Sequence, residues 1–287
     1  MGDVAFRLHR VLDPLHAMIY FAPETEDKLT ATGLRPGRMC YFAGRSAAFG
    51  AIGAGGVAAT FYNFNPELVA RHIPRAWTLA TPAEVLAARL EAADTVLRRL
   101  LGDEVVASAE VAEAAELARE AAGGCTPEGR PLYAAHADLP YPAEPHLALW
   151  HAITLLREFR GDGHIAALIE HGLSGLGALV THTATGKGFQ AAAARLTRGW
   201  SDEQWDAEVA ALGERGLMDT EGELTGKGHE LRADIERVTN QAAIGPWTHL
   251  GADKTERLHD LGRELSRTAV SAGAFPSGVF AAGAGRG

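Results

Sequence analysis

Ionisable side chains are densest between Leu156 and His164, in a chain that is otherwise rich in Ala, Leu and Gly. Five of them occur within eight positions: Arg157, Glu158, Arg160, Asp162 and His164. Polar groups between apolar elements cost folding energy unless they find partners. The cluster therefore either braces the fold through ion pairs or leaves an arginine to bind an acidic ligand group in bidentate fashion. His164, at the expected start of a helix, could act as an acid or base, or as a polar residue of the helix cap.

Aromatic residues gather in the first 65 positions, as Tyr20, Tyr41, Phe42, Phe61, Tyr62 and Phe64. Such residues mostly form a core, but they also line apolar ligand pockets. Combining them with the polar cluster gives a set of candidate ligand contacts around a small apolar or weakly acidic molecule: His16, Tyr20, Arg45, Asn63, Arg157, Arg160 and His164. No residue is assigned a catalytic role.

Motifs for common cofactors and nucleophiles are missing from the sequence. The twelve histidines include no His-Glu-x-x-His pair, so no metal site is expected. The Gly-rich stretch at 50–56 lacks the Lys-Ser/Thr of a phosphate loop, and no Gly-x-Ser-x-Gly elbow occurs. The sequence therefore names no cofactor.

Composition is that of a water-soluble globular protein. Of 287 residues, 47% are hydrophobic and 22% are charged, and the formal net charge of -9 disfavours binding to a polyanion. The two cysteines, Cys40 and Cys125, lie far apart, which fits a reducing compartment. The first residues lack the pattern of a signal peptide, and no apolar run is long enough to cross a membrane. These features predict a cytoplasmic protein.

Helix boundaries can be predicted at several positions. Asp13-Pro14 and Pro23 are typical helix starts, and Thr81-Pro82-Ala83-Glu84 is a capping box for a helix that ends at Gly102. Further helices are expected at about 105–122, 147–159 and 164–171, the last two separated by a break at Arg160–Gly163. Ser201 is expected to cap another helix.

The domain organisation predicted from these elements has two helical units. Residues 1–122 form the first, the Pro- and Gly-rich stretch 123–145 is a linker, 146–272 form the second, and 273–287 are a flexible tail. His16-Ala-Met-Ile-Tyr-Phe and His151-Ala-Ile-Thr-Leu-Leu occupy similar places in the two units. Either they mark a diverged duplication, with a ligand cleft between the halves, or helical hairpins resemble each other by chance.

The C-terminal segment resembles a known family. Leu212-Gly-Glu-Arg-Gly-Leu217, a short hairpin and Leu224-Thr-Gly-Lys-Gly-His-Glu-Leu231 are similar to the winged-helix domain of MarR-type regulators, over residues 189–245. The whole chain resembles an actinobacterial family of helix-turn-helix proteins, a likeness that implies a fold more than an activity. It implies a mainly α fold of two winged-helix-like units, with a small β-wing at 217–219 and 223–225 in the second.

The charges of the winged helix depart from the MarR pattern. Its recognition helix contains one basic residue, Arg215, against five acids: Asp202, Glu203, Asp206, Glu208 and Glu214. The wing contains three more acids and no arginine. Each carboxylate near a phosphate adds repulsion instead of releasing counterions, so DNA binding is disfavoured.

Three hypotheses follow. The leading one is a small-molecule-binding protein on a winged-helix scaffold, with an apolar cleft between its halves, acting as a sensor or a biosynthetic enzyme. The alternatives are a MarR-like DNA-binding transcriptional regulator and a non-catalytic structural or interaction protein. The oligomeric state stays open, with a dimer among the options.

Overall fold

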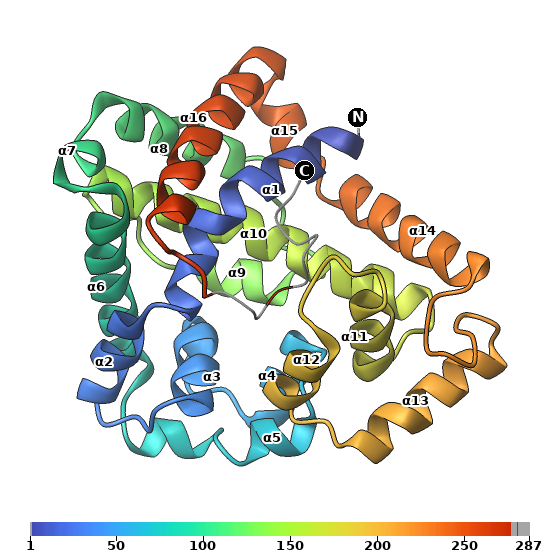
Figure 1. Ribbon diagram of the computed structural model, residues 1–287. Coiled ribbons are helices and arrows are strands. Elements are labelled where there is room, and N and C mark those ends of the chain that lie inside the picture. The colour runs from blue at the N-terminus through green and yellow to red at the C-terminus, as the bar shows by residue number, and fades with distance from the viewer. Residues whose placement is uncertain (1, 277–279, 281–287) are drawn as a thin grey trace. The chain divides into compact units, whose positions relative to one another are not determined.

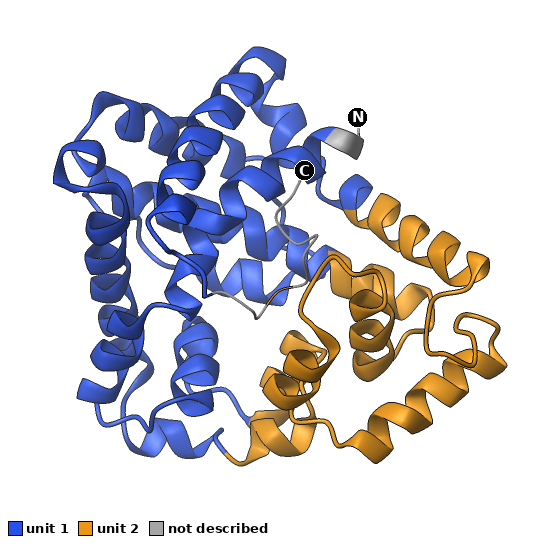
Figure 2. Cartoon of the chain, viewed as in Figure 1, with its two compact units in different colours: residues 1–53, 72–163, 240–276 blue, residues 54–71, 164–239, 277–287 orange. Residues whose placement is uncertain are grey.

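The computed structural model describes residues 2–276 and residue 280, and nearly all of its regular structure is helical (Figure 1). The chain divides into two compact units (Figure 2). Unit 1 comprises residues 1–53, 72–163 and 240–276, and unit 2 comprises residues 54–71, 164–239 and 277–287. Each unit therefore combines segments that are far apart in the sequence. The predicted division at 122, 145 and 272 stays a prediction, and the predicted tail lies largely outside the described residues.

Unit 1 contains most of the helices. They are α1 (Gly2–Ala17), η1 (Met18–Tyr20), α2 (Pro23–Ala31), α3 (Arg38–Ser46), η2 (Ala47–Phe49), η3 (Arg75–Thr78), α6 (Pro82–Leu101), α7 (Asp103–Val106), α8 (Ala109–Ala122), α9 (Pro131–Ala137), α15 (Gly245–Leu250) and α16 (Ala252–Ser271). Unit 2 contains α4 (Ala54–Phe61), α5 (Pro66–Ala70), α11 (Gly175–Thr183), α12 (Ala191–Arg198) and α13 (Asp202–Glu214). Helices α10 (Pro145–Glu170) and α14 (Gly226–Ala242) contribute residues to both units.

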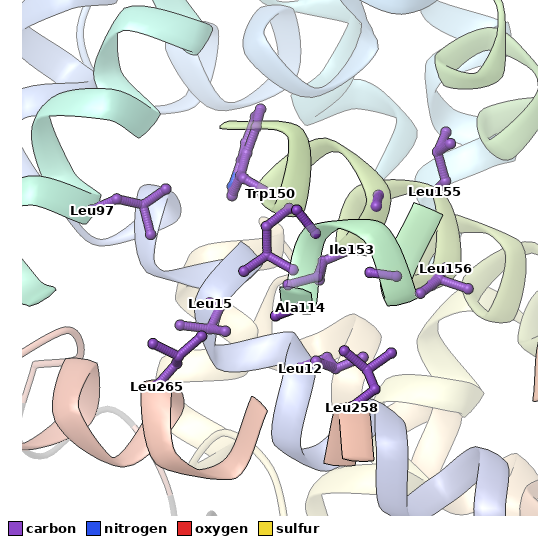
Figure 3. Close-up of a cluster of buried hydrophobic side chains, with 14 of the residues drawn as sticks. Leu12, Leu15, Leu97, Ala114, Trp150, Ile153, Leu155, Leu156, Leu258 and Leu265 are labelled. Carbon is purple, nitrogen blue, oxygen red and sulfur yellow. The ribbon is translucent and has the colours of Figure 1, made fainter. Parts of the chain in front are cut away.

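The core of unit 1 forms where apolar positions recur at helical spacing. Leu12 and Leu15 of α1, Leu97 of α6, Ile153 of α10 and Leu258 of α16 are all buried in one cluster (Figure 3). Their spacing places one face of each helix toward the others, which is the pattern of an amphipathic helix packed on a shared core. This cluster fixes the helices that carry the candidate site.

Two local helix signals are confirmed. Thr81 and Glu84 form the predicted capping box of α6, and Ser201 and Gln204 form one at the start of α13. In each, the side chains and backbone N–H groups of positions three apart satisfy one another, so the signal needs no distant partner. Asn65 likewise accepts a hydrogen bond from the Glu67 N–H and caps α5.

The start predicted at Asp13-Pro14 is wrong, because α1 begins at Gly2 and runs through Pro14. A proline inside a helix removes one backbone hydrogen bond and crowds the preceding turn. Leu8, Leu12 and Leu15 are nevertheless buried on both sides of it. The burial of this apolar face outweighs the local cost, so the helix continues.

The break predicted at Arg160–Gly163 is also wrong, because α10 is continuous from Pro145 to Glu170. A Cβ at Gly163 would lie 2.4 Å from Nη1 of Arg130. The glycine therefore lets the Arg130 guanidinium pack against the helix, where it donates to the carbonyl groups of Phe159 and Ala242. Here glycine serves a close approach and does not end the helix.

Asp162, next to that glycine, also has a structural partner. Its carboxylate accepts hydrogen bonds from the backbone N–H groups of Leu132 (3.0 Å) and Tyr133 (2.9 Å), in the first turn of α9. Those N–H groups have no acceptor within their own helix, so a carboxylate from another helix supplies it. The stretch 123–145, expected as a linker, thus contains a helix that is held from α10.

The wing of unit 2 is smaller than expected. Among the described residues no strand is found, and Met218 and Leu224 form only an isolated antiparallel bridge. The turn between them is closed by the Asp219 carboxylate, which accepts from the N–H groups of Glu221 and Glu223. The hairpin is present, but the two-stranded β-wing is not confirmed, and neither is the arrangement as two winged-helix units.

Gly175 is the position in unit 2 where a side chain is least tolerable. A Cβ there would lie 1.9 Å from the carbonyl oxygen of Tyr62. We expect Gly175→Ala to lower the free energy of unfolding by about 1–3 kcal/mol, because backbone cannot move aside as a flexible side chain can. Thermal and urea unfolding measure this effect.

Gly226 provides the matched control, since it begins α14 and a Cβ there would meet nothing within 4 Å. Gly226→Ala should leave stability unchanged or raise it slightly, through the better helix propensity of alanine. Equal effects of the two substitutions would contradict the close approach at Gly175.

Candidate functional site

A cavity of about 300 Å³ in unit 1 opens among η1, α2, α3 and α6. Aromatic rings of Tyr20, Phe21 and Tyr41 form part of its wall, and the rings of Tyr20 and Tyr41 lie 5.4 Å apart. Arg45 and Arg89 also line it. The pocket thus combines an apolar, aromatic lining with two guanidinium groups and the carboxylate of Glu26.

A chain of hydrogen bonds fixes the Tyr20 hydroxyl at this wall. The Thr154 hydroxyl donates to the Trp150 carbonyl (2.8 Å), so its oxygen is left to accept from Nδ1 of His16 (2.9 Å). Nε2 of His16 is then the acceptor for the Tyr20 hydroxyl, at 2.9 Å. Burial lowers the pKa of His16 well below its usual range, and nearby arginines add to this, so the ring is neutral. Its tautomer aims the Tyr20 proton at His16 and leaves the phenol oxygen to accept.

Behind the pocket lies a buried ion-pair network. The Glu158 carboxylate, 1% exposed, accepts from Arg45 (3.1 Å) and from Arg157 (2.7 Å). Burial alone would raise the pKa of Glu158, but the two guanidinium groups hold it well below its ordinary value. Arg157 also pairs with Asp13 at 3.1 Å. Glu158 therefore remains ionised and fixes the position of Arg45.

Arg89 completes the wall from the buried face of α6 and is only 4% exposed. Its guanidinium lies over the Trp150 ring, 4.7 Å from the centroid, and Nη1 is 3.4 Å from Nε2 of His136. Its Nε and Nη2 have no hydrogen-bond partner among the described residues. Burial lowers the pKa of Arg89, but a guanidinium stays charged at any ordinary pH.

Four of the seven predicted contact residues meet here: His16, Tyr20, Arg45 and Arg157. Arg160 lies elsewhere in unit 1, where Nη2 donates to Asn240 at 3.0 Å. The other two belong to unit 2. Nδ1 of His164 is 2.9 Å from the Thr239 hydroxyl, and the Asn63 carbonyl accepts from Trp200. A ligand-binding role for any of the seven stays a prediction.

Arg89 is not among the residues predicted from the sequence, whereas Glu158 is expected there as a member of a bracing ion-pair cluster and does pair with Arg45 and Arg157. A signal for Arg89 does exist, because it falls on the apolar face of its helix, four residues after Val85 and four before Ala93. A charged residue on such a face needs a partner or a function.

Metal ligation has no geometric basis in the described part of the chain, where His, Cys, Asp and Glu form no group of three or more suited to an ion. The two cysteines are free, and burial raises the pKa of Cys40 to about 11 and that of Cys125 to about 12. Both thiols are therefore protonated at neutral pH and are weak nucleophiles.

In unit 2, α12 and α13 are joined by a short turn and followed by the 218–224 hairpin. Seven residues of α13 and this hairpin are both acidic and exposed: Asp202, Glu203, Asp206, Glu214, Asp219, Glu221 and Glu223. Arg215 donates to the carbonyl groups of His171 and Gly172, and Arg195 pairs with Asp202 at 2.6 Å. These two basic residues near the acidic surface are thus engaged in the fold.

None of the helices in the described residues is both long and apolar enough to span a bilayer. A family model described as a helix-turn-helix family matches residues 5–276, and the chain belongs to that family. No curated protein and no solved structure matches the chain. The relation to MarR-type regulators and an actinobacterial origin stay predictions.

Proposed function

Within this helix-turn-helix family, we propose that the chain is a small-molecule-binding protein whose ligand occupies the pocket of unit 1. The carrying observation is a cavity of about 300 Å³ that combines aromatic walls with convergent polar groups. This volume is at the lower end of the range usual for ligand sites, which are mostly apolar with a few placed polar groups. A molecule of one or two rings fits these dimensions.

The polar groups of the pocket are held before any ligand arrives. His16 orients the Tyr20 hydroxyl, and Glu158 holds the Arg45 guanidinium. A preorganised site loses less conformational entropy on binding than a mobile one. This arrangement favours recognition of a specific molecule over a purely bracing role for the cluster.

A sensor and an enzyme would both use this pocket, and they differ in whether the bound molecule is altered. For an enzyme, Tyr20 is the group placed to move a proton, because its hydroxyl already donates to a neutral imidazole. For a sensor, the same hydroxyl only orients the ligand.

Native mass spectrometry of the protein purified from its own host tests the proposal. We expect an added mass on the wild type that is lost in Thr25→Phe, because Thr25 lines the pocket with a buried, unpartnered hydroxyl and a phenyl ring would fill the space. Thr95→Phe, on an exposed position of α6, is the matched control and should keep the mass. The proposal is contradicted if Thr25→Phe keeps the added mass, or if the wild type carries no added mass at all.

The second candidate is a MarR-like DNA-binding regulator, and membership of a helix-turn-helix family favours it. In such proteins the second helix of the motif enters the major groove. The exposed acids of α13 and the hairpin oppose this, since carboxylates on that surface would repel the phosphate backbone. A gel shift with genomic fragments at low salt separates the two. A specific, salt-sensitive complex would place regulation first.

A further inference from the structure

We propose that the ligand of the unit 1 pocket is an aromatic monocarboxylate, and that its carboxylate is bound by Arg89. This inference rests on the proposed function and names the chemical class of the ligand. It is carried by the contacts of Arg89, by the count of buried charges and by the pocket wall.

Arg89 is a buried cation without a counter-ion. Among the residues that the structure describes, no ion pair involves it, and two of its three nitrogens lack any acceptor. The third has a long contact with Nε2 of His136, which accepts because Nδ1 of that ring already faces the Leu132 carbonyl at 2.9 Å. The guanidinium also lies beside the neutral Tyr20 hydroxyl, which supplies no charge. A buried charge is costly unless it is paired. A guanidinium that lines a pocket under these conditions favours an anion from outside.

The surrounding charges indicate a single negative charge on that anion. Three guanidinium groups, those of Arg45, Arg89 and Arg157, lie near two carboxylates, Glu158 and Asp13. Both carboxylates are engaged by Arg157, and Glu158 also by Arg45. Glu26 also lines the pocket, but it is exposed and accepts from the Gly37 N–H group. Among these groups Arg89 is therefore the buried cation without a paired carboxylate, and a monoanion neutralises it whereas a phosphate dianion overcompensates it. A planar carboxylate also matches the fork of a guanidinium.

The remaining wall selects an aromatic body for the ligand. Tyr20, Phe21 and Tyr41 face the cavity, together with apolar side chains such as Ile19 and Leu29. Aromatic rings prefer edge-to-face and offset contacts with other rings, which these walls offer. The carboxylate then points toward Arg89.

Calorimetric titration tests the assignment with phenylacetate, indole-3-acetate and 4-hydroxybenzoate, each paired with its neutral amide, and with inorganic phosphate. We expect the wild type to bind at least one acid tenfold or more tightly than its amide, and to bind phosphate weakly or not at all. Arg89→Met should lose tenfold or more in affinity for that acid and little for the amide. Arg89→Lys, which keeps the charge but not the fork, should lie between them.

The controls distinguish a failure of the carboxylate assignment from a failure of the proposed pocket function. Arg263→Gln, a half-exposed arginine of α16, should bind as the wild type does. Arg89→Met should melt no lower than the wild type without ligand, whereas a bracing role predicts a clear drop. Equal binding of acids and amides overturns the carboxylate but leaves the pocket function standing, provided that Thr25→Phe abolishes both. No binding of any pair overturns the assignment.

Discussion

At pH 5 the protein should have lost several kcal/mol of the stability that it has at pH 7, because unit 1 buries neutral histidines. His16, His136 and His151 are 0%, 1% and 5% exposed. Burial lowers the pKa of His136 and His151 to about 4, and holds that of His16 well below 6.5. Below pH 6.5 the unfolded chain therefore binds more protons than the folded one, and stability falls with pH until the folded pKa values are reached.

The loss of stability from the buried histidines is larger than the opposing contribution of Asp162. Each buried histidine costs about 1.4 kcal/mol of stability per pH unit below 6.5, so these three cost about 6 kcal/mol by pH 5. His9 and His182, whose pKa values burial also lowers to about 4, add to this loss. Asp162 acts in the opposite direction, because burial raises its pKa to about 6 and the folded state then gains protons first. One carboxyl returns only about 1–1.5 kcal/mol over this window. Glu158, with its lowered pKa, contributes only below about pH 4.5.

Urea unfolding from pH 8 to pH 5 measures the effect as the number of protons taken up on unfolding. With five such histidines, less about one proton for Asp162, we expect about three to four near pH 5. His151→Phe should reduce this number by about one, since the phenyl ring can keep the edge contact with Tyr141 and cannot titrate. His229→Gln, at an exposed position, is the control and should leave the slope unchanged. A flat pH profile would mean that these rings are not buried as described.

The sequence predicts well those features that depend only on neighbouring residues, such as helix starts. The capping boxes at Thr81 and Ser201 are satisfied within four residues, so their patterns suffice to place helix starts. The Arg160–Gly163 segment resembles a helix break when Gly163 is judged only by its neighbours in the sequence. The true role of Gly163 depends on Arg130, which comes from another part of the chain. Local signals cannot report such tertiary contacts.

The candidate site divides in the same way. His16 and Tyr20 are four residues apart on consecutive helical turns, so their contact follows from spacing alone. The partners of Glu158 and Arg89 are not local: Arg45 is 113 positions from Glu158, and His136 is 47 positions from Arg89. The residue types are informative, but the fold determines that Arg45 pairs with a carboxylate and that Arg89 does not.

Glu158→Gln should lower the free energy of unfolding by about 3–5 kcal/mol, the usual cost of removing one partner from a buried ion pair. The reason is that Arg45 and Arg157 would stay buried and charged without the carboxylate that both bind. Chemical unfolding at pH 7 measures the loss. Glu113→Gln removes an exposed carboxylate that pairs with Arg257, and should have no detectable effect.

A triple variant then separates the two roles of this network. Arg45→Met, Glu158→Leu and Arg157→Met together remove the three charges of the network, and replacing a whole buried ion-pair group with apolar residues is often neutral or stabilising. Asp13, which loses Arg157, is 30% exposed and can be solvated, and Arg89 keeps the charge that it has in the wild type. We expect the triple variant to recover most of the stability lost in Glu158→Gln while binding the aromatic acids more weakly, because Arg45 would no longer line the pocket beside Arg89. If the triple variant binds them as the wild type does, the network only braces unit 1. If Glu158→Gln is as mild as Glu113→Gln, the carboxylate is solvated and the buried network does not exist.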